Sequence, residues 1–347
     1  KRKQALDAEK RMRQKLLDER DAMYRIAHYK KTNPSVGDQR QRETQRHTGS
    51  QAQQDEKVFP VKALPPHRAT TPEQKIDEKL HIVFSTDCSA YQDWQSLVVF
   101  HSAYQVKQLG KITRIASGCD AAKKIKLTQL YDMLWPQYGV HFTPDFTKTK
   151  TGEKYEFYNK PYGLLDFLDN NSAVEKDAII AIIDPDFIFL RPLTRYVKGQ
   201  QANLIHAVRH RFPPKEFDYI DKGRPVAQLY GLGAPWTDDH HKKFNRTRIC
   251  GVGSPCLEVN DDEGRQHYAV GPPYILHRDD IHRLAKTWTS IVPKVYEGYP
   301  FLLAEMYAYS MAAAHEKLPH LTFRNHMVSN TDSGDDEAWQ HVSALGM

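Results

Sequence analysis

The sequence predicts an α/β domain built on a mostly parallel sheet that is flanked by helices. The first observation is the run of residues 178–190, where unbroken apolar residues lead into Asp184-Pro-Asp186. Such a run is typical of a strand buried on both faces. The second observation is a strand, a helix and a strand in succession between residues 80 and 117. A helix that connects two strands in this way makes them parallel.

Apolar periodicity and turn residues give the individual elements. Strands are predicted at 80–86, 111–117 and 268–277, and helices at 160–169 and 305–314. A further helix is predicted to run from Asp279 or Asp280, as its N-cap, to Trp288. Helix 93–108 is predicted to pack one apolar face on the sheet, formed by Trp94, Leu97, Val98, His101 and Tyr104.

Composition predicts three regions. Residues 1–57 carry 15 Lys/Arg against 9 Asp/Glu, and we expect a charged helical stem followed by a disordered arm. Residues 58–79 are rich in proline and predict an extended linker, and we expect residues 80–340 to form the main folded domain. The stem helix is either solvated or a weak coiled coil that binds a partner.

The charge distribution argues against a nucleic-acid partner. All of the formal net charge of +6 lies in residues 1–57, and the rest of the chain carries 34 basic and 34 acidic residues. The chain has neither a run of about 18 apolar residues nor a secretory h-region. We therefore expect a membrane connection only through a segment absent from this chain. Such a segment would have preceded Lys1, since the chain does not begin with Met.

Asp184 and Asp186 are the strongest candidates for chemistry. Residues i and i+2 of a strand lie on one side, and hard carboxylate oxygens at the end of a buried strand suit Mg²⁺ or Mn²⁺. Ligands of open α/β sheets bind at this edge. An Asp-X-Asp pair in this setting is the signature of glycosyltransferases that use nucleotide sugars. The alternative is a capped strand end.

Four cysteines are present: Cys88, Cys119, Cys250 and Cys256. The spacing of the last two suits either a small disulfide loop or free buried thiols. The triplets that begin at Asn170 and Asn245 match the N-glycosylation sequon and are compatible with a protein of the secretory pathway.

A series of motifs across residues 80–325 resembles the plant and algal hydroxyproline O-arabinosyltransferases and the related peptidyl serine α-galactosyltransferases. Asp-Pro-Asp is closer to the first branch, whereas the 84–95 and 159–161 motifs are closer to the second. The Gly-Pro-Pro-Tyr element matches neither branch well. In order, the motifs are Phe84-Ser-Thr-Asp-Cys-Ser-Ala-Tyr-Gln-Asp-Trp-Gln95, Ile112-Thr-Arg-Ile115, Asn159-Lys-Pro161, Asp184-Pro-Asp186, Val270-Gly-Pro-Pro-Tyr-Ile-Leu-His277 and Glu305-Met-Tyr-Ala-Tyr309.

The resemblance implies a GT-A-like, Rossmann-type fold and a retaining, metal-dependent transfer. The donor would be a UDP-sugar carrying arabinofuranose or galactose, held with Mn²⁺ or Mg²⁺. The acceptor would be hydroxyproline or serine of a secreted or cell-wall glycoprotein. The family often has a membrane-anchored stem before the domain, so we expect a type II protein in the lumen of the Golgi or the endoplasmic reticulum.

The motifs also suggest roles for single residues. Asp186 would bind the metal, and Asp184 the metal, the donor ribose or both. A late histidine, His326 or His277, would complete the metal ligands. Other donor contacts are expected from Thr86, Asp87, Arg114, Asn159 and Lys160, where Lys160 lies at a helix N-terminus suited to phosphates.

Glu305 is the candidate catalytic residue. A carboxylate among Met306, Tyr307 and Tyr309 needs either a function or a buried partner. It would orient the acceptor or stabilise the positive charge that develops on the sugar. The structural alternatives are a salt-bridged Glu305 and, for the donor contacts, capping turns and a surface arginine. Tyr274, Trp236 and Trp288 either line the acceptor groove or belong to the core.

Two other functions compete with glycosyl transfer. The same carboxylates would serve a nucleotidyl- or phosphotransferase, although no phosphate-binding Gly-X-X-X-X-Gly-Lys loop supports that class. A non-catalytic scaffold with a glycosyltransferase-like domain and a partner-binding N-terminal helix is the alternative from another class. The Asp184/Asp186 pair argues against the scaffold.

Overall fold

The computed structural model describes residues 79–134, 137–148, 152, 154–171, 174–197, 217–238 and 243–329. They all belong to the compact unit Ala63–Met347. The predictions for the charged stem, the disordered arm and most of the proline-rich linker lie outside the described residues. No helix among the described residues is long and apolar enough to cross a membrane.

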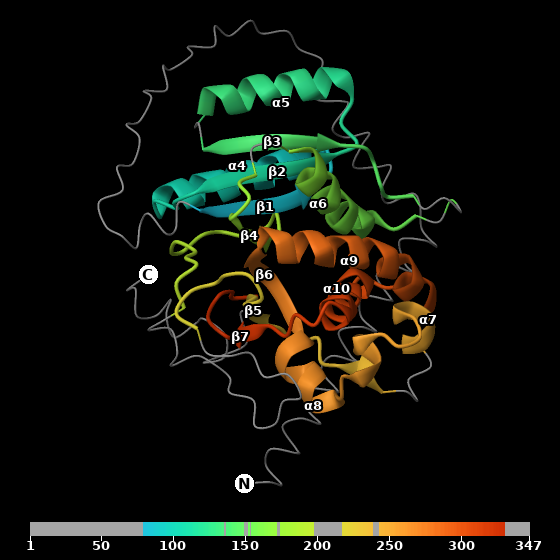
Figure 1. The fold of residues 1–347 in the computed structure, drawn as a ribbon. Helices are drawn as coiled ribbons and strands as arrows, with labels where there is room; N and C mark the ends of the chain where they lie inside the picture. Colours follow the sequence, from blue (N-terminus) through green and yellow to red (C-terminus); the bar gives the residue numbers. More distant parts are fainter. Residues whose placement is uncertain are drawn as a thin grey trace, which may run out of the picture. The chain divides into compact units, whose positions relative to one another are not determined.

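The described residues form an α/β fold around one seven-stranded, mostly parallel sheet, as the sequence predicts (Figure 1). The strand order is β3-β2-β1-β4-β6-β5-β7. Strands β3, β2, β1 and β4 are parallel, β6 is antiparallel to both β4 and β5, and β7 is parallel to β5. The strands are β1 (Leu80–Thr86), β2 (Lys111–Ser117), β3 (Tyr138–Thr143), β4 (Ile179–Ile183), β5 (Val226–Leu229), β6 (Val270–His277) and β7 (Leu321–Phe323).

This topology creates one functional edge. Every strand of the sheet except β6 ends at the same edge, and β6 begins there. The segments that follow β1, β4 and β7 contain Asp87, Asp184 and His326. Residues far apart in the sequence are therefore brought to the edge where α/β sheets bind ligands.

Two apolar clusters cover the two faces of the sheet. Helices α6 (Asn159–Asn170), α9 (Arg278–Gly298) and α10 (Ala304–His315) pack on one face with Ile180, Ile182 and Tyr274. Helix α4 (Ala90–Gln105) and Tyr131 of α5 (Ala121–Leu134) pack on the other face with Phe84 and Ile183. Figure 1 shows α6 and α9 side by side. The sheet is thus buried on both faces, which explains the apolar run before Asp184.

Several predicted elements have the expected bounds. The observed β1 and β2 match residue for residue, and α6, β4 and α10 differ from the prediction by one residue or a few at their ends. Helix α9 is longer than predicted, and its N-cap is His277 instead of Asp279 or Asp280. The ring nitrogen Nδ1 of His277 accepts a hydrogen bond from the backbone N–H of Asp279 at 3.1 Å.

The prediction of which side chains of α4 pack on the sheet is wrong. Trp94 and Leu97 are 60% and 39% exposed, whereas Val99, Phe100 and Ala103 face the sheet. The four consecutive apolar residues 97–100 fit either face of a helix, so periodicity alone does not select one. Trp236, Tyr274 and Trp288, which were also considered as groove residues, are fully buried core residues.

Two disulfides are present among the described residues. Cys88–Cys119 joins the segments that follow β1 and β2, with 5.2 Å between the Cα atoms. Cys250–Cys256 closes the small loop that was one of the two alternatives for this pair. The first disulfide therefore ties together two segments at the functional edge.

A fully buried arginine holds the end of β1 in place. Arg114 is 0% exposed, and its Nε donates to Thr86 Oγ1 at 2.7 Å. Its Nη1 donates to Asp93 Oδ1 at 2.8 Å and to the Tyr131 hydroxyl at 3.1 Å, while Nη2 donates to the Asp87 carbonyl at 2.8 Å. Since a buried charge is costly unless it is paired and hydrogen-bonded, this set of partners fixes the strand end.

We predict that Asp93→Asn destabilises the fold in a pH-dependent way. Burial alone would raise the Asp93 pKa, but hydrogen bonds from Lys123 and Arg114 outweigh it and lower the pKa below 3.8. The stabilisation is therefore present above the unfolded-state pKa and is lost as the pH falls through the folded-state pKa. At neutral pH the substitution should lower the free energy of unfolding by about 1.5–3 kcal/mol, the range for hydrogen bonds to charged groups.

Urea unfolding from neutral pH to about pH 3 measures this effect, because the stabilities of the variant and the wild type should converge at acidic pH. Asp177→Asn is the control, since Asp177 pairs with Lys79 at the surface and should change stability less. A stability difference that stays constant across this pH range would contradict the assignment.

Candidate functional site

The end of β4 presents two carboxylates. Asp184 follows Ile183 directly, and its carbonyl accepts a hydrogen bond from the N–H of Phe187 at 3.2 Å. This bond closes a turn around Pro185 that holds both aspartates at the edge of the sheet. The Asp184 side chain is 33% exposed and Asp186 is exposed. Both carboxylates are therefore within reach of solvent and of a ligand.

A lysine whose side chain is only 12% exposed lies between Asp184 and Glu305. The Lys160 Nζ is 2.7 Å from Asp184 Oδ1 and 3.4 Å from Glu305 Oε1. Lys160 and Glu305 lie in the first turns of α6 and α10, so the site brings together two helix N-termini and a strand end. Three motifs that sequence reasoning had considered separately form one cluster.

The side chain of Glu305 is almost fully buried, at 3% exposed, and its backbone is fixed on both sides. The Tyr155 hydroxyl accepts from the Glu305 N–H at 3.0 Å and donates to the Leu302 carbonyl at 2.9 Å. The Trp288 Nε1 donates to the Glu305 carbonyl at 3.0 Å. The aromatic side chains of Tyr155 and Trp288 therefore fix the backbone that carries the carboxylate.

The electrostatics of the cluster are strongly coupled. Burial raises the pKa of Glu305 to about 7; Lys160 opposes this shift and Asp184 adds to it. Burial would lower the pKa of Lys160, but Asp184 and Glu305 outweigh it and raise that pKa. Partial desolvation, together with the charge of Asp184, raises the pKa of Asp186. Asp184 and Asp186 thus repel each other, and a bound cation would relieve this repulsion.

The other predicted donor contacts lie at the same edge but have partners within the protein. Thr86 is buried and accepts from Arg114. Asp87 is exposed, and its Oδ1 accepts from the Ser89 N–H at 2.8 Å in a local turn. The Oδ1 of Asn159 accepts from the Phe146 N–H at 2.8 Å. The buried Arg114 positions Thr86 and Asp87, and direct donor contacts from these residues remain predictions.

The two histidine candidates lie at opposite edges of the sheet. His277 pairs with Ile179 at the start of β4, so it lies about 13 Å from the end of that strand at the usual rise per residue. The prediction that His277 is a metal ligand is therefore wrong. His326 follows β7 at the functional edge and stacks on Phe323 at 4.7 Å between ring centroids. Burial and then the charge of Arg191 lower its pKa to about 3.

Among the described residues, no three His, Cys, Asp or Glu side chains gather into a metal-binding group. His326 therefore remains a predicted ligand without a cluster to support it. Mg²⁺ usually keeps several waters and is bound through one or two carboxylates together with substrate phosphates. Asp184 and Asp186 fit that donor set.

Sequence reasoning missed two residues that shape the site. Tyr155 bonds to the backbone of both Leu302 and Glu305, and nothing in the local sequence signals this contact. Gln228 is fully buried, and its Oε1 accepts from the N–H groups of His326 and Met327 at 2.9 and 3.0 Å. A glutamine within a predicted buried strand would have been the signal, but β5 was not predicted.

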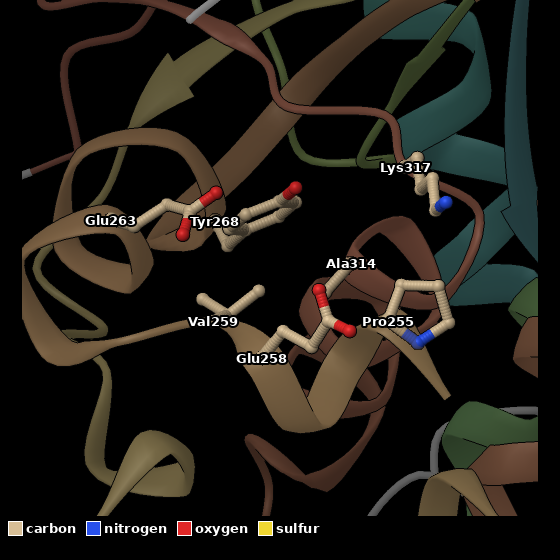
Figure 2. A pocket seen from close by; sticks show the side chains of 7 residues that line it. All are labelled: Pro255, Glu258, Val259, Glu263, Tyr268, Ala314 and Lys317. Atoms are coloured by element: carbon tan, nitrogen blue, oxygen red, sulfur yellow. The ribbon is translucent and has the colours of Figure 1, made fainter. Parts of the chain in front are cut away.

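Two hollows in the described part lie elsewhere. A cavity of about 10 Å³ lies by the C-terminal end of α10, with Glu263 and Tyr268 on one side and Lys317 on the other (Figure 2). This space is about that of a single water. A larger hollow, of about 440 Å³, borders Lys176 and Asp279 near the opposite edge of the sheet. Neither is lined by Asp184, Lys160 or Glu305.

Comparison with known proteins finds relatives in the same group of glycosyltransferases that the motifs resemble. The model of the hydroxyproline O-arabinosyltransferase family N-terminal domain matches residues 80–215. Peptidyl serine alpha-galactosyltransferases of Arabidopsis thaliana and Chlamydomonas reinhardtii are 26% and 24% identical over 249 and 258 residues. Each match covers 70% of this chain, which spans 27% and 30% of the length of these relatives. These matches confirm the resemblance predicted from the motifs.

We predict that Lys160→Met destabilises the protein through Glu305. Removing the ammonium leaves a buried carboxylate beside Asp184, and breaking a buried ion pair in this way costs about 3–5 kcal/mol. Adding Glu305→Gln should recover part of the loss, with a coupling of about 0.5–3 kcal/mol in a double-mutant cycle. Thermal or urea unfolding of the two single variants and the double variant measures it.

Lys154→Met is the matched control, because Lys154 and its partner Glu156 are 60% and 72% exposed. It should leave stability nearly unchanged. Additive effects of Lys160→Met and Glu305→Gln would show that the two groups do not interact.

Proposed function

We propose that the chain is a retaining, metal-dependent glycosyltransferase, because it is similar to the hydroxyproline O-arabinosyltransferases and the peptidyl serine α-galactosyltransferases. It would move arabinofuranose or galactose from a UDP-sugar to hydroxyproline or serine of a secreted or cell-wall protein. The observation that carries the proposal is the cluster in which Lys160 bridges Asp184 and Glu305 at the carboxyl edge of the sheet.

The sheet supports a GT-A-like assignment. Its parallel half, β3-β2-β1-β4, would bind the nucleotide, and Asp184 and Asp186 follow the last strand of that half. Beyond β4 lies the antiparallel strand β6, and the elements after it supply Glu305. A donor bound at this edge would therefore meet residues from both halves.

The donor diphosphate needs positive charge. Asp184 and Asp186 would hold Mn²⁺ or Mg²⁺, which would neutralise the departing diphosphate when bound. The protein adds the Lys160 ammonium and the positive ends of two helices, α6 and α10, both of which begin at the cluster. The charge of Lys160 is maintained by its two carboxylate partners.

Glu305 would act on the sugar. In the transfer, the bond between the anomeric carbon and the diphosphate oxygen breaks, and a bond to the acceptor hydroxyl forms on the same face. The acceptor proton passes to the departing diphosphate. A carboxylate held by Lys160 would stabilise the positive charge that develops on the sugar and orient the acceptor.

A lumenal location accords with the cysteines and with one sequon. Two disulfides are typical of an oxidising compartment. Asn245 is exposed and begins the sequon Asn245-Arg-Thr247. Its Oδ1 caps α7 (Arg246–Cys250) by accepting from the Arg248 N–H at 2.9 Å, so the bond uses the oxygen and not the nitrogen that carries a glycan. We propose the Golgi or the endoplasmic reticulum, with a type II membrane anchor.

Asp186→Asn tests the metal. For the wild type, UDP and Mn²⁺ together should stabilise the protein by about 2.7 kcal/mol at a hundredfold excess over the dissociation constant. That is a rise of roughly 5–10 °C in Tm for a domain of this size. The variant should fold but lose this rise, since a hard cation depends on carboxylate ligands.

Asp262→Asn, an exposed carboxylate of α8 (Asp261–Glu263), is the control and should keep the full rise in Tm. A full rise in Asp186→Asn would refute the metal assignment. No rise in the wild type would instead support a non-catalytic scaffold.

Glu305→Gln tests the catalytic role. It keeps the shape of the side chain but removes the charge, so turnover should fall by at least ~100-fold, as for the loss of a transition-state contact. Donor affinity should change little, because only the transition state carries the opposing charge. The measurements are kcat by UDP release and donor binding by thermal shift.

Glu297→Gln, at an exposed carboxylate that pairs with Arg248, serves as the control and should retain activity. Normal turnover in Glu305→Gln would exclude the catalytic role. Collapse of stability with no specific loss of turnover per folded molecule would assign Glu305 to structure.

Asn245→Gln tests the location. When the chain is secreted from a eukaryotic cell, enzymatic removal of N-glycans should lower the mass of the wild type, and peptide mass spectrometry should find the glycan at Asn245. The variant should lack that glycan. An unmodified Asn245 together with reduced cysteines would argue against the lumen.

A further inference from the structure

The hollow of about 440 Å³ lies at the edge of the sheet opposite the charged cluster. Its lining comes from three places: the C-terminal end of α6, the segment before β4 and the start of α9. A volume of this size is within the range of ~300–1,000 Å³ that ligand pockets have. None of the residues assigned to glycosyl transfer lines it, so its occupant must be sought in other chemistry.

Contacts between these three segments fix the walls of the hollow. The His282 Nε2 of α9 lies 2.6 Å from Asp169 Oδ1 of α6. The N–H of Arg278, the first residue of α9, donates to the carbonyl of Ala178 just before β4 at 2.8 Å. Each contact joins segments that are far apart in the sequence. The hollow is therefore a built feature of the fold.

The lining suits a neutral ligand that is rich in polar groups. The carboxylates of Asp169 and Asp279 can accept further hydrogen bonds, because each carboxylate has about four acceptor sites. Lys176 and Arg278 can donate them. The Arg278 Nε is buried and has no hydrogen-bond partner within the described part of the chain, which is costly for a donor. Since the two positive and two negative side chains balance, the lining does not select an ion.

Asn170 lines the same hollow and begins a sequon for N-glycosylation. It is the last residue of α6, and it is exposed. Its side chain makes no hydrogen bond or ion pair in the described structure, whereas the side chain of Asn245, which begins the other sequon, caps α7. The amide nitrogen that would carry a glycan is therefore available at the hollow itself.

We propose that Asn170 carries an N-linked glycan and that the hollow holds the first sugar of this glycan. The proposal rests on the lumenal location given under the proposed function. The N-acetylglucosamine that begins an N-linked glycan is neutral, and its hydroxyl and acetamide groups match the donors and acceptors of the lining. One of its oxygens would give the Arg278 Nε the acceptor that it lacks.

Covalent attachment explains why this sugar would occupy the hollow. A group tethered by a short linker has an effective concentration on the order of mM at a neighbouring site. Contacts too weak to bind a free sugar are therefore enough to hold one that is attached to Asn170. The hollow needs only the modest affinity that a few hydrogen bonds supply.

The test measures how fast each glycan is removed from the native protein. The wild type is secreted from a eukaryotic cell and treated with an enzyme that cleaves N-glycans from asparagine, and peptide mass spectrometry follows Asn170 and Asn245 separately. Native release from Asn170 should be at least ~10-fold slower, because the sugar must first leave the hollow. After denaturation the two rates should be equal.

Two variants weaken the hollow. Arg278→Met and Lys176→Met each remove a donor and should each speed native release from Asn170 by at least ~3-fold, the effect of losing one hydrogen bond. Lys176 is exposed, so its variant serves the test if Arg278→Met does not fold. Arg265→Met is the matched control, because Arg265 and its partner Asp261 are 53% and 56% exposed and do not line the hollow.

The Tm gives a second measurement. Asn170→Gln should lower the Tm of the secreted protein by about 2–4 °C, the shift expected for a modest loss of stability in a domain of this size. The same substitution should leave the Tm unchanged in protein made by a host that does not glycosylate. Only the glycosylated protein has a sugar to lose from the hollow.

Other results would overturn the proposal. A glycan at Asn245 with none at Asn170 would refute it and leave the proposed location intact. No glycan at either site, together with reduced cysteines, would refute the location as well. Equal native release from the two sites would show that the sugar projects into solvent. Slow release that neither Arg278→Met nor Lys176→Met speeds would assign the protection to the polypeptide and not to the hollow.

Discussion

The Lys160 ammonium is the interaction on which the site depends. It links the start of α6 to the end of β4 and to the start of α10, which are 24 and 145 residues further along the chain. Burial raises the pKa of Glu305 to about 7 although Lys160 opposes the shift, so the ionised form of Glu305 depends on this partner. If α6, α10 or the end of β4 moved away, Lys160 or Glu305 would lose its ion-pair partner in a buried position, which is costly. The three elements are therefore held in a single arrangement.

The topology of the sheet brings these three segments to the same edge. The strands of the parallel half end together, and the buried Arg114 fixes the end of β1 through Thr86 and the Asp87 carbonyl. The disulfide Cys88–Cys119 joins the segments after β1 and β2 at the same edge. Its two cysteines each lie two residues beyond neighbouring strands, a spacing that predicts their proximity once the strands are known to be parallel.

Local sequence patterns predicted most of the strands and helices and several site residues, but few of the contacts between residues far apart in the sequence. The apolar runs define β1, β2 and β4, and the motifs single out Lys160, Asp184 and Glu305. The contact between these three residues depends on packing across the sheet, which no spacing encodes. The prediction of which face of α4 is buried was wrong, because the four consecutive residues 97–100 are all apolar and fit either face. Tyr155, which hydrogen-bonds to the backbone of Glu305, lies 150 residues away in the sequence, so no local pattern could reveal it.

The balance of charge at the site explains why metal and nucleotide are expected to bind together. Asp184, Asp186 and Glu305 face one lysine. Burial is the main cause of the raised pKa values of Asp186 and Glu305, and the negative charge of Asp184 adds to it. Under the proposed function, a diphosphate alone would be repelled by the same carboxylates. A divalent cation held by Asp184 and Asp186 would reverse the sign of the local electrostatic field, and Lys160 and two helix N-termini would then attract the diphosphate. Under the proposed function, the carboxylate pair would make donor binding conditional on the cation.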